Sequence, residues 1–426
     1  MKLLRMLCLL AVGVLYAQTA VDPAAVARKG VDLLLTEKYS ELFQIFSPQM
    51  QKDIPEAALP KIAAQFKGLG APDSIGQPET RKAGPNTIVM IAVKFSAQSF
   101  RMQMAVNAAG QLTAMVPIGG EVAWQRPSYS KPDSFTARPV TVGQGDWKLP
   151  GVVNVPKGDG PFPGVVLVHG FGPNDRDETV GGTKMFRDLA EGLASRGIVV
   201  LRYDKRSRVY GPKFAGVANR TVHEETVEDA AAAANVLRAQ KEVDPKRIYV
   251  LGHDLGGYLA PRIAGEDEKL TGLIILAGHV RPLEDLIVDQ AVSGGTTGAK
   301  LDTLKSQAAR VKSLEQADYD LPPIMGMPPA YWLDLKGYSP TEEAKKHPLR
   351  VLVLQGERDS QVSMKDFDMW KSALSGNKSV EVHSYPSLNH LFVAGEGKST
   401  EAEYRKPGHV APEVVDEIAK WLSAGA

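Results

Sequence analysis

Three side chains that could act together on a substrate lie far apart in the sequence: Asp254, Asp359 and His390. Asp254 is the third residue of Gly-His-Asp-Leu-Gly-Gly, which separates an apolar run from a segment with helical spacing. A residue in such a tight strand-to-helix turn is presented at the end of a sheet, and the flanking glycines avoid backbone clashes. Asp359 and His390 each follow a later predicted strand, in the chain order nucleophile, acid, histidine. The spacing predicts one site built from all three.

Each of these positions has a simpler interpretation. Asp359 alone could be a turn-forming aspartate, His390 alone could be a surface-loop histidine, and Glu357 is a second choice for the acid. Their order, each after a strand end, favours the joint site. His253 is expected to be structural. The remaining histidines weighed have no position with an assigned role: His223, His279, His347, His383 and His409. No metal-ligand spacing such as His-Glu-x-x-His is present, so we expect no metal and no cofactor.

A pair of backbone N–H groups completes the predicted site. His169 and Gly170 follow another apolar run, and glycine at 170 and 172 lets the backbone approach closely. The N–H groups of Phe171 and Leu255 should converge on one oxygen and stabilise negative charge there. Charged residues gather nearby and are interpreted as structural ion pairs, with substrate binding the less favoured alternative. They are Asp175, Arg176, Asp177, Glu178, Arg202, Asp204, Lys205 and Arg206.

The elements that position these residues alternate between strands and helices. Strands are predicted at 162–170, 198–204, 247–253, 272–278, 351–356 and 380–386, and helices at 184–197, 227–240, 255–264 and 412–422. Continuous apolar runs separated by amphipathic helices specify a mostly parallel sheet covered on both faces, an α/β fold. The interval after residue 278 is too long for a plain connection and predicts a helical cap insertion at about 281–345.

A different pattern precedes this region. Residues 26–35, 39–46 and 58–66 have helical spacing, whereas 87–95, 100–107 and 111–118 alternate as consecutive strands. This predicts a small α+β domain over 21–123 and a Pro- and Ser-rich linker over 124–134 before an α/β domain over 135–426. Residues 1–20 have a basic start, a short apolar stretch and small residues, as in a secretory signal peptide. The protein is therefore predicted to be secreted or periplasmic.

Amino-acid composition limits the kinds of binding partner that we expect. Fifty Lys and Arg against 49 Asp and Glu give a formal charge of +1, which offers no reason to expect nucleic acid. The apolar stretch near the start is too short to span a membrane, so no span is expected in the mature chain. Cys8 is the only cysteine and lies in the predicted signal, which leaves neither disulfides nor a catalytic thiol. A small-molecule substrate is the expected partner, and the oligomeric state stays open.

The region from about residue 135 to the end resembles the α/β-hydrolase superfamily. The stretches at 169–182, 185–208, 250–264 and 275–286 are similar to a branch of secreted bacterial esterases. Those esterases also carry a small α+β domain in front, and the one here resembles the nuclear-transport-factor-like module. The resemblance implies hydrolysis of carboxylic esters, with residue 254 as nucleophile, His390 as base and Asp359 orienting it. That branch has serine where this chain has Asp254.

An aspartate at this position changes the expected chemistry. Two N–H groups and a helix N-terminus favour the ionised form of Asp254, and His390 between two carboxylates favours its protonated form. Attack of Asp254 on an ester carbonyl would give an adduct that collapses backwards, because a carboxylate leaves more readily than an alkoxide. Attack on a saturated carbon would instead give an alkyl ester that water, activated by His390, could hydrolyse.

Three hypotheses follow. The first is a hydrolase of small to medium apolar carboxylic esters, with Asp254 as a base for water. The second is an aspartate-nucleophile hydrolase of epoxides or activated alkyl compounds. Its proton donor would be a lid tyrosine, with Tyr319, Tyr331 and Tyr338 as candidates. Dehalogenation is not favoured, because Phe171 and Leu255 have no side-chain N–H to hold a halide. The third is a catalytically silent binding protein.

Overall fold

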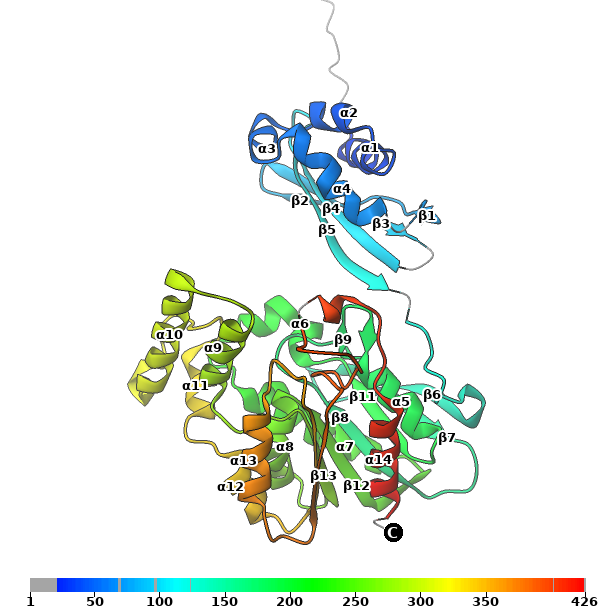
Figure 1. Cartoon of the computed structure of the whole chain (residues 1–426), viewed down its shortest axis with the longest axis vertical. Coiled ribbons are helices and arrows are strands. Elements are labelled where there is room, and N and C mark those ends of the chain that lie inside the picture. The colour runs from blue at the N-terminus through cyan, green and yellow to red at the C-terminus, as the bar shows by residue number, and fades with distance from the viewer. Residues whose placement is uncertain (1–20, 68–69, 96–97, 123, 401, 425–426) are drawn as a thin grey trace, which may run out of the picture. The chain divides into compact units, whose positions relative to one another are not determined.

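The computed structural model describes residues 21–67, 70–95, 98–122, 124–400 and 402–424, and the chain divides into two compact units, Met1–Ala123 and Trp124–Ala426 (Figure 1). The predicted signal segment, residues 1–20, lies outside the described residues.

The first unit combines helices with an antiparallel sheet. Its helices are α1 (Pro23–Leu35), α2 (Tyr39–Gln44), α3 (Pro48–Asp53) and α4 (Leu59–Lys67). Its strands are β1 (Ser74–Ile75), β2 (Glu79–Ala83), β3 (Asn86–Lys94), β4 (Gln98–Val106) and β5 (Leu112–Val122), in the order β1-β3-β4-β5 with β2 paired to β3. Alternate residues of β3, Val89, Ile91 and Val93, are fully buried in one cluster with Val31 of α1. The period of two read from the sequence therefore marks the face that packs on the helices.

The second unit is built on an eight-stranded sheet in the order β15-β14-β13-β12-β8-β11-β7-β6. Its strands are β6 (Phe135–Val142), β7 (Leu149–Pro156), β8 (Phe162–Val168), β11 (Val199–Tyr203), β12 (Val243–His253), β13 (Gly272–Leu276), β14 (Arg350–Gly356) and β15 (Val380–Tyr385). Strands β11, β8, β12, β13, β14 and β15 pair in this order and are all parallel. Strand β7 runs antiparallel to both β11 and β6. The predicted mostly parallel α/β sheet is confirmed.

Two apolar layers cover this sheet. Along β8, Val165 and Leu167 belong to one buried cluster and Val166 and Val168 to the other. The first cluster includes residues of α5 (Met185–Ala194) and α14 (Pro412–Ser423). The second includes residues of α7 (Glu228–Arg238), α8 (Leu255–Glu266) and α13 (Met364–Ala373). Both faces of the sheet are therefore buried, which explains why the strands are continuous apolar runs in the sequence.

The remaining elements are short or belong to the predicted cap. Strands β9 (Thr179–Val180) and β10 (Thr183–Lys184) form a small hairpin, and α6 (Arg206–Ala215) precedes a π-helical turn at 223–227. Between β13 and β14 lie α9 (Leu283–Ser293), α10 (Gly298–Ser313), α11 (Pro329–Leu335) and α12 (Pro340–Lys346). Trp332 of α11 is buried and its indole N–H donates to the carbonyl of Ile324 at 2.9 Å. The insertion thus has its own helices and packs on the main core.

The segment predicted as a linker is bound to the second unit. The indole N–H of Trp124 donates to Asp188 of α5 at 2.7 Å, and Ser130 donates to Glu191 at 2.7 Å. The hydroxyl of Tyr129 donates to the carbonyl of Val410 at 2.8 Å.

In the described part of the chain, no helix has the length and apolar character needed to cross a bilayer.

Candidate active site

Asp254 occupies a sharp turn between β12 and α8. Its backbone has φ 50° and ψ −112°, a left-handed conformation that is costly for a residue other than glycine. A Cβ atom at Gly252 would overlap the backbone of Gly256, and one at Gly256 would overlap the carbonyl of Val168. Glycine at both positions is therefore required by the close approach of β8, β12 and α8. The turn presents Asp254 at the carboxyl end of the sheet, as the spacing predicts.

The Asp254 carboxylate accepts a hydrogen bond from one of the two predicted anion-binding N–H groups. The Phe171 N–H donates to Oδ2 of Asp254 at 3.0 Å, and Leu255 is the first residue of α8, where backbone N–H groups have no partner within the helix. Burial opposes ionisation of Asp254, but the positive charge of nearby imidazoles and the Phe171 N–H outweigh it, so the pKa of this carboxyl is lowered. These imidazoles are His390, His279 and His253. Asp254 is therefore an anion whose own oxygen occupies one donor of the expected oxyanion hole.

Asp359 and His390 are paired. Oδ2 of Asp359 lies 2.7 Å from Nδ1 of His390, and both side chains are buried. The other carboxylate oxygen of Asp359 accepts from the N–H groups of Gln361 at 2.7 Å and Val362 at 2.9 Å. Glu357, the second choice for the acid, instead accepts a hydrogen bond from a serine hydroxyl on β15. The arrangement holds the imidazole by Nδ1 and leaves Nε2 for chemistry.

The imidazole of His390 also lies beside the elbow. Its ring centroid is 4.5 Å from that of His253, the neighbour of Asp254, and Nε2 of His253 is 3.0 Å from the carbonyl oxygen of His390. The structure thus brings Asp254, Asp359 and His390 to one end of the sheet. An anion, an imidazole and a second anion are the groups that proton transfer at a carbonyl would use.

Sequence reasoning missed a buried ion pair behind the site. Oε2 of Glu178 lies 3.2 Å from Nδ1 of His253, and Oε1 of Glu178 accepts from the Gly170 N–H at 2.7 Å. Burial alone would lower the pKa of His253, but Glu178 outweighs it and raises this pKa to about 9. At the neighbouring strand end, burial lowers the pKa of His169 to about 4. The sequence placed Glu178 in a charge cluster, and nothing in that pattern distinguished it from its charged neighbours.

Most of that charge cluster is structural. Arg176 pairs with Asp204 at 2.6 Å, and Asp177 pairs with Arg202 and, at 3.4 Å, with Lys184. These contacts join the loop after β8 to the ends of neighbouring strands. The interpretation as ion pairs fits them, whereas Glu178 and Lys205 contact the backbone of the loop that carries Phe171.

Two of the lid tyrosines considered as proton donors are engaged elsewhere. The hydroxyl of Tyr331 donates to Glu225 at 3.4 Å, and that of Tyr338 donates to the carbonyl of Tyr258 at 3.1 Å. The ring of Tyr258 stacks on His279, with centroids 4.1 Å apart. His279 had no assigned role, yet it is one of the buried histidines that lower the pKa of Asp254.

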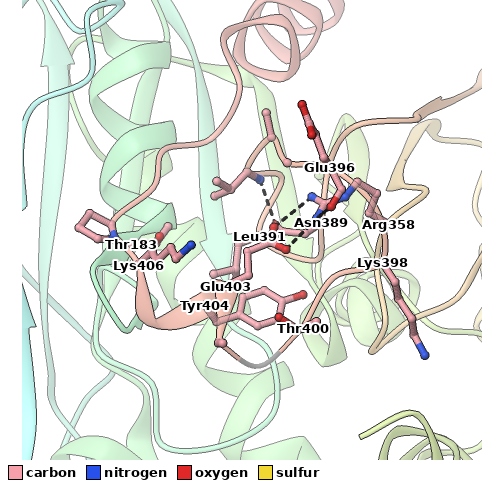
Figure 2. Close-up of a pocket in the computed structure, with 15 residues that line it drawn as sticks. Thr183, Arg358, Asn389, Leu391, Glu396, Lys398, Thr400, Glu403, Tyr404 and Lys406 are labelled. Carbon is pink, nitrogen blue, oxygen red and sulfur yellow. Dashed lines mark hydrogen bonds and ion pairs between the residues drawn. The ribbon is translucent and has the colours of Figure 1, made fainter. Parts of the chain in front are cut away.

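A pocket of about 500 Å³ lies beside the loop that carries His390 (Figure 2). Two of its charged residues form an ion pair: Arg358 binds Glu403 at 2.7 Å, and Asn389 donates to the same carboxylate at 2.8 Å. The guanidinium also donates to the carbonyls of Glu396 and Gly397. This network secures the loop that carries His390.

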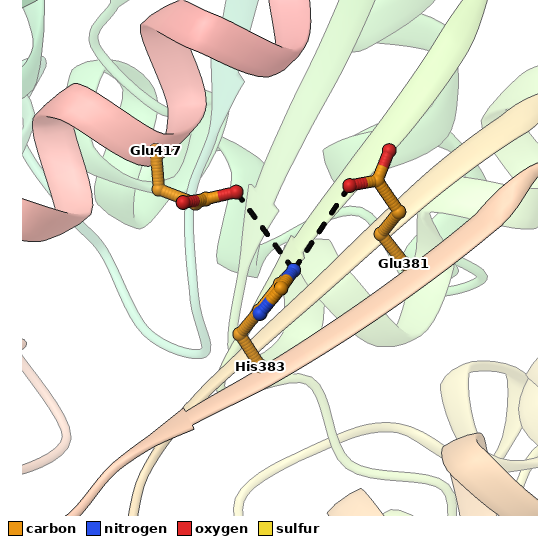
Figure 3. A group of neighbouring side chains, drawn as sticks. All are labelled: Glu381, His383 and Glu417. Atoms are coloured by element: carbon orange, nitrogen blue, oxygen red, sulfur yellow. Dashed lines mark ion pairs between the residues drawn. The ribbon is translucent and has the colours of Figure 1, made fainter.

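In the described residues, one group of side chains has the geometry to hold a metal ion (Figure 3). Glu381 and His383 of β15 lie near Glu417 of α14, and Nε2 of His383 is 4.0 and 3.8 Å from the two carboxylates. Exposed ion pairs account for these contacts. None of Asp254, Asp359 and His390 belongs to the group.

Comparisons with known proteins agree with this architecture. A family model described as the alpha/beta hydrolase family matches residues 165–396. Esterase EstD of Thermotoga maritima is 35% identical over 403 residues, which cover 92% of this chain and 93% of that protein. Human mitochondrial acyl-coenzyme A thioesterase 2 is 26% identical over 278 residues, 62% of this chain and 49% of that one.

Solved structures are also similar. An esterase of Pyrococcus furiosus aligns with a TM-score of 0.44 and 15% identity, covering 69% of this chain and 93% of that chain. Est1E from Butyrivibrio proteoclasticus aligns with a TM-score of 0.44 and 16% identity, covering 67% and 99%. Because the family model spans more than half of the chain and a relative is 35% identical along nearly all of it, this protein belongs to the alpha/beta hydrolase family.

Proposed function

We propose that the protein hydrolyses carboxylic esters of small molecules. The observation that carries the proposal is the Asp359–His390 pair, 2.7 Å apart, at the same sheet end as an elbow residue bound by the Phe171 N–H. The similarity to esterase EstD along 92% of the chain supports the same reaction class. We further propose small to medium apolar esters, in keeping with the partly exposed ring of Phe171 beside the elbow.

Asp254 acts as a base for water in this proposal. Water adds its oxygen to the ester carbonyl carbon and gives a proton to Asp254, and the departing alcohol takes that proton back as its C–O bond breaks. A covalent route through Asp254 is disfavoured because the anhydride-forming adduct would expel the carboxylate again. The ester oxygen must also compete with Oδ2 of Asp254 for the Phe171 N–H, which is bound at 3.0 Å. We therefore expect slow turnover.

The test compares the natural chain with Asp254→Ser on short-chain nitrophenyl esters, with Asp254→Ala as a matched control that has neither hydroxyl nor carboxylate. Serine at 254 should raise kcat by about 10² or more, because nucleophilic and acid–base groups contribute on that scale. Adding His390→Gln to Asp254→Ser should remove the gain. If Asp254→Ser is no faster than Asp254→Ala, the proposal is wrong.

Isotope incorporation separates the alternatives. After turnover in H₂¹⁸O, the intact mass of the protein should stay unchanged, because Asp254 forms no ester on this pathway. Incorporation of ¹⁸O into Asp254, together with opening of styrene oxide, would instead support the aspartate-nucleophile hypothesis. The hydroxyls of Tyr331 and Tyr338 already donate to other groups, so we rank that hypothesis second. Inactivity of every variant would leave a binding protein.

We also propose that the protein is exported and that residues 1–20 are removed. The basic, apolar and small residues of this segment support export. The mass of protein recovered from the bacterial periplasm should correspond to a start near residue 21. Recovery of the full-length chain in the cytoplasm would contradict this proposal.

A further inference from the structure

We propose that Lys205 is a positioning residue that aims and polarises the Phe171 N–H for the developing oxyanion. The inference rests on the proposed ester hydrolysis for its catalytic part. Lys205 follows β11, whereas Phe171 follows β8, so the two residues come from neighbouring parallel strands. Nothing in the sequence pattern separates Lys205 from the charged residues on either side of it.

The contact that matters is to the peptide bond itself. Nζ of Lys205 donates to the carbonyl oxygen of Gly170 at 2.8 Å. The Gly170 carbonyl and the Phe171 N–H belong to one planar trans peptide and point in opposite directions. On the opposite side, the Phe171 N–H donates to Oδ2 of Asp254 at 3.0 Å. Fixing the carbonyl with Lys205 therefore fixes the direction of the N–H.

A buried charge also strengthens the donor. Lys205 is only 1% exposed, so its hydrogen bond to Gly170 is little screened by water. A charge-assisted bond to the carbonyl draws electron density through the peptide and makes the N–H a better donor. Asn174 donates to the same carbonyl at 3.1 Å, but its amide is neutral. The two donors are thus matched in target and differ in charge.

The surroundings keep Lys205 in place. Oε1 of Glu225 lies 3.9 Å from Nζ, and the hydroxyl of Tyr331 donates to the other oxygen of Glu225 at 3.4 Å. The preceding peptide of the same loop is held by an opposite charge, because the Gly170 N–H donates to Glu178 at 2.7 Å. Both peptides that flank Gly170 are therefore held by buried ionic side chains, a lysine on one and a glutamate on the other.

The first experiment reads the Phe171 N–H directly and needs no catalysis. The chain has 12 phenylalanines, so full-length protein with ¹⁵N-phenylalanine gives a simple amide spectrum, and Phe171→Leu identifies the resonance. In Lys205→Met, the Phe171 amide proton should move upfield and exchange with deuterium faster. Asn174→Ala should produce a smaller change, and Lys205→Arg should restore most of the parent shift. An unmoved resonance in Lys205→Met overturns the inference.

The second experiment measures turnover in the Asp254→Ser background. Lys205→Met should lower kcat about tenfold and change KM less than about twofold, since loss of a whole oxyanion donor costs about 10² to 10³ in kcat. If Lys205→Met does not fold, Lys205→Met with Glu225→Gln removes both buried charges and takes its place.

The outcomes separate the two proposals. A moved resonance with a lower kcat supports the inference. A moved resonance with unchanged kcat overturns its catalytic part. If Asp254→Ser is inactive but the resonance moves, the positioning by Lys205 stands and the proposed ester hydrolysis fails.

Discussion

The two units of the chain bury different kinds of side chain. In the first unit, the buried polar residues among those described are Ser47 and Thr87, neither of which carries a charge. In the second, buried ionic residues gather behind the elbow and the Phe171 loop, including Glu178, Lys205 and Asp359. All eight histidines and all five tryptophans also follow residue 123.

The buried charged residues lie in the same unit as the candidate active site. Burying a charge costs free energy unless a partner of opposite sign and further hydrogen bonds compensate it. An apolar core such as that of the first unit gains stability without this cost. The second unit retains buried charges where they hold a backbone N–H, an imidazole or a loop. All tryptophans of the chain lie in the second unit, so tryptophan fluorescence follows the unfolding of that unit alone.

The largest effect is expected from removing a buried charge. Asp366 is fully buried and accepts from the guanidinium of Arg281 at 2.7 Å and from the N–H of Val280 at 3.0 Å. Asp366→Ala should lower the free energy of unfolding of the second unit by about 3 to 5 kcal/mol, because it leaves the Arg281 guanidinium with Asp289 as its remaining carboxylate partner and removes the acceptor of the Val280 N–H. Denaturant titration followed by tryptophan fluorescence measures this loss. A change below about 1 kcal/mol would contradict the assigned importance of buried charge.

A pH dependence should follow from His253. Its pKa is raised to about 9 in the folded chain, above the ordinary value of 6.5. The stabilisation is therefore complete below pH 6.5 and is lost as the pH rises to about 9, in total about 3 kcal/mol. Tryptophan-detected unfolding between these pH values measures it. His253→Gln should be less stable and should flatten the profile over this window.

The first unit should show neither behaviour. Ile91 is fully buried in its apolar core, and Ile91→Val should cost about 1 kcal/mol by removing one methylene group. Hydrogen exchange of peptides from residues 21–122, read by mass spectrometry, reports this loss. The size of the loss should be the same at pH 6.5 and pH 9, since this segment has no histidine. A loss that depends on pH would contradict the expectation that only the second unit has pH-dependent stability over this range.

The smallest effect tests burial against charge alone. Lys345 pairs with Glu342 at 2.7 Å on the surface of the second unit, and both side chains are largely exposed. Lys345→Ala should change the free energy of unfolding by less than about 0.5 kcal/mol. A loss comparable to that of Asp366→Ala would show that charge, irrespective of burial, stabilises this unit.

Much of the fold could be predicted because its signals are local. The alternation in 87–95 and the apolar runs at 162–170 and 351–356 each specify a strand from neighbouring residues only. Strand β6, at the edge of the sheet, and its neighbour β7 were not predicted. Half of the residues of β6 are exposed, with Thr136 and Ala137 exposed in succession, and Pro139 weakens the strand signal, although proline is tolerated at a sheet edge.

The candidate site divides in the same way. Their order in the chain and their positions after predicted strands identified Asp254, Asp359 and His390 as candidates, and the structure places these residues together. The supporting contacts of Glu178 and Lys205 could not be found, because each joins segments from different strands. A charged residue in a run of charges gives no indication of which one turns inward.

The amino-acid sequence by itself determined the order of helices and strands and the place of the elbow, since hydrophobic period and glycine spacing are properties of adjacent residues. Only the tertiary structure decided which acid meets His390, where the Asp254 carboxylate rests, and which charges hold the Phe171 loop. Those outcomes depend on distances of a few ångströms between segments far apart in the chain, and on burial, which sets the strength of each contact.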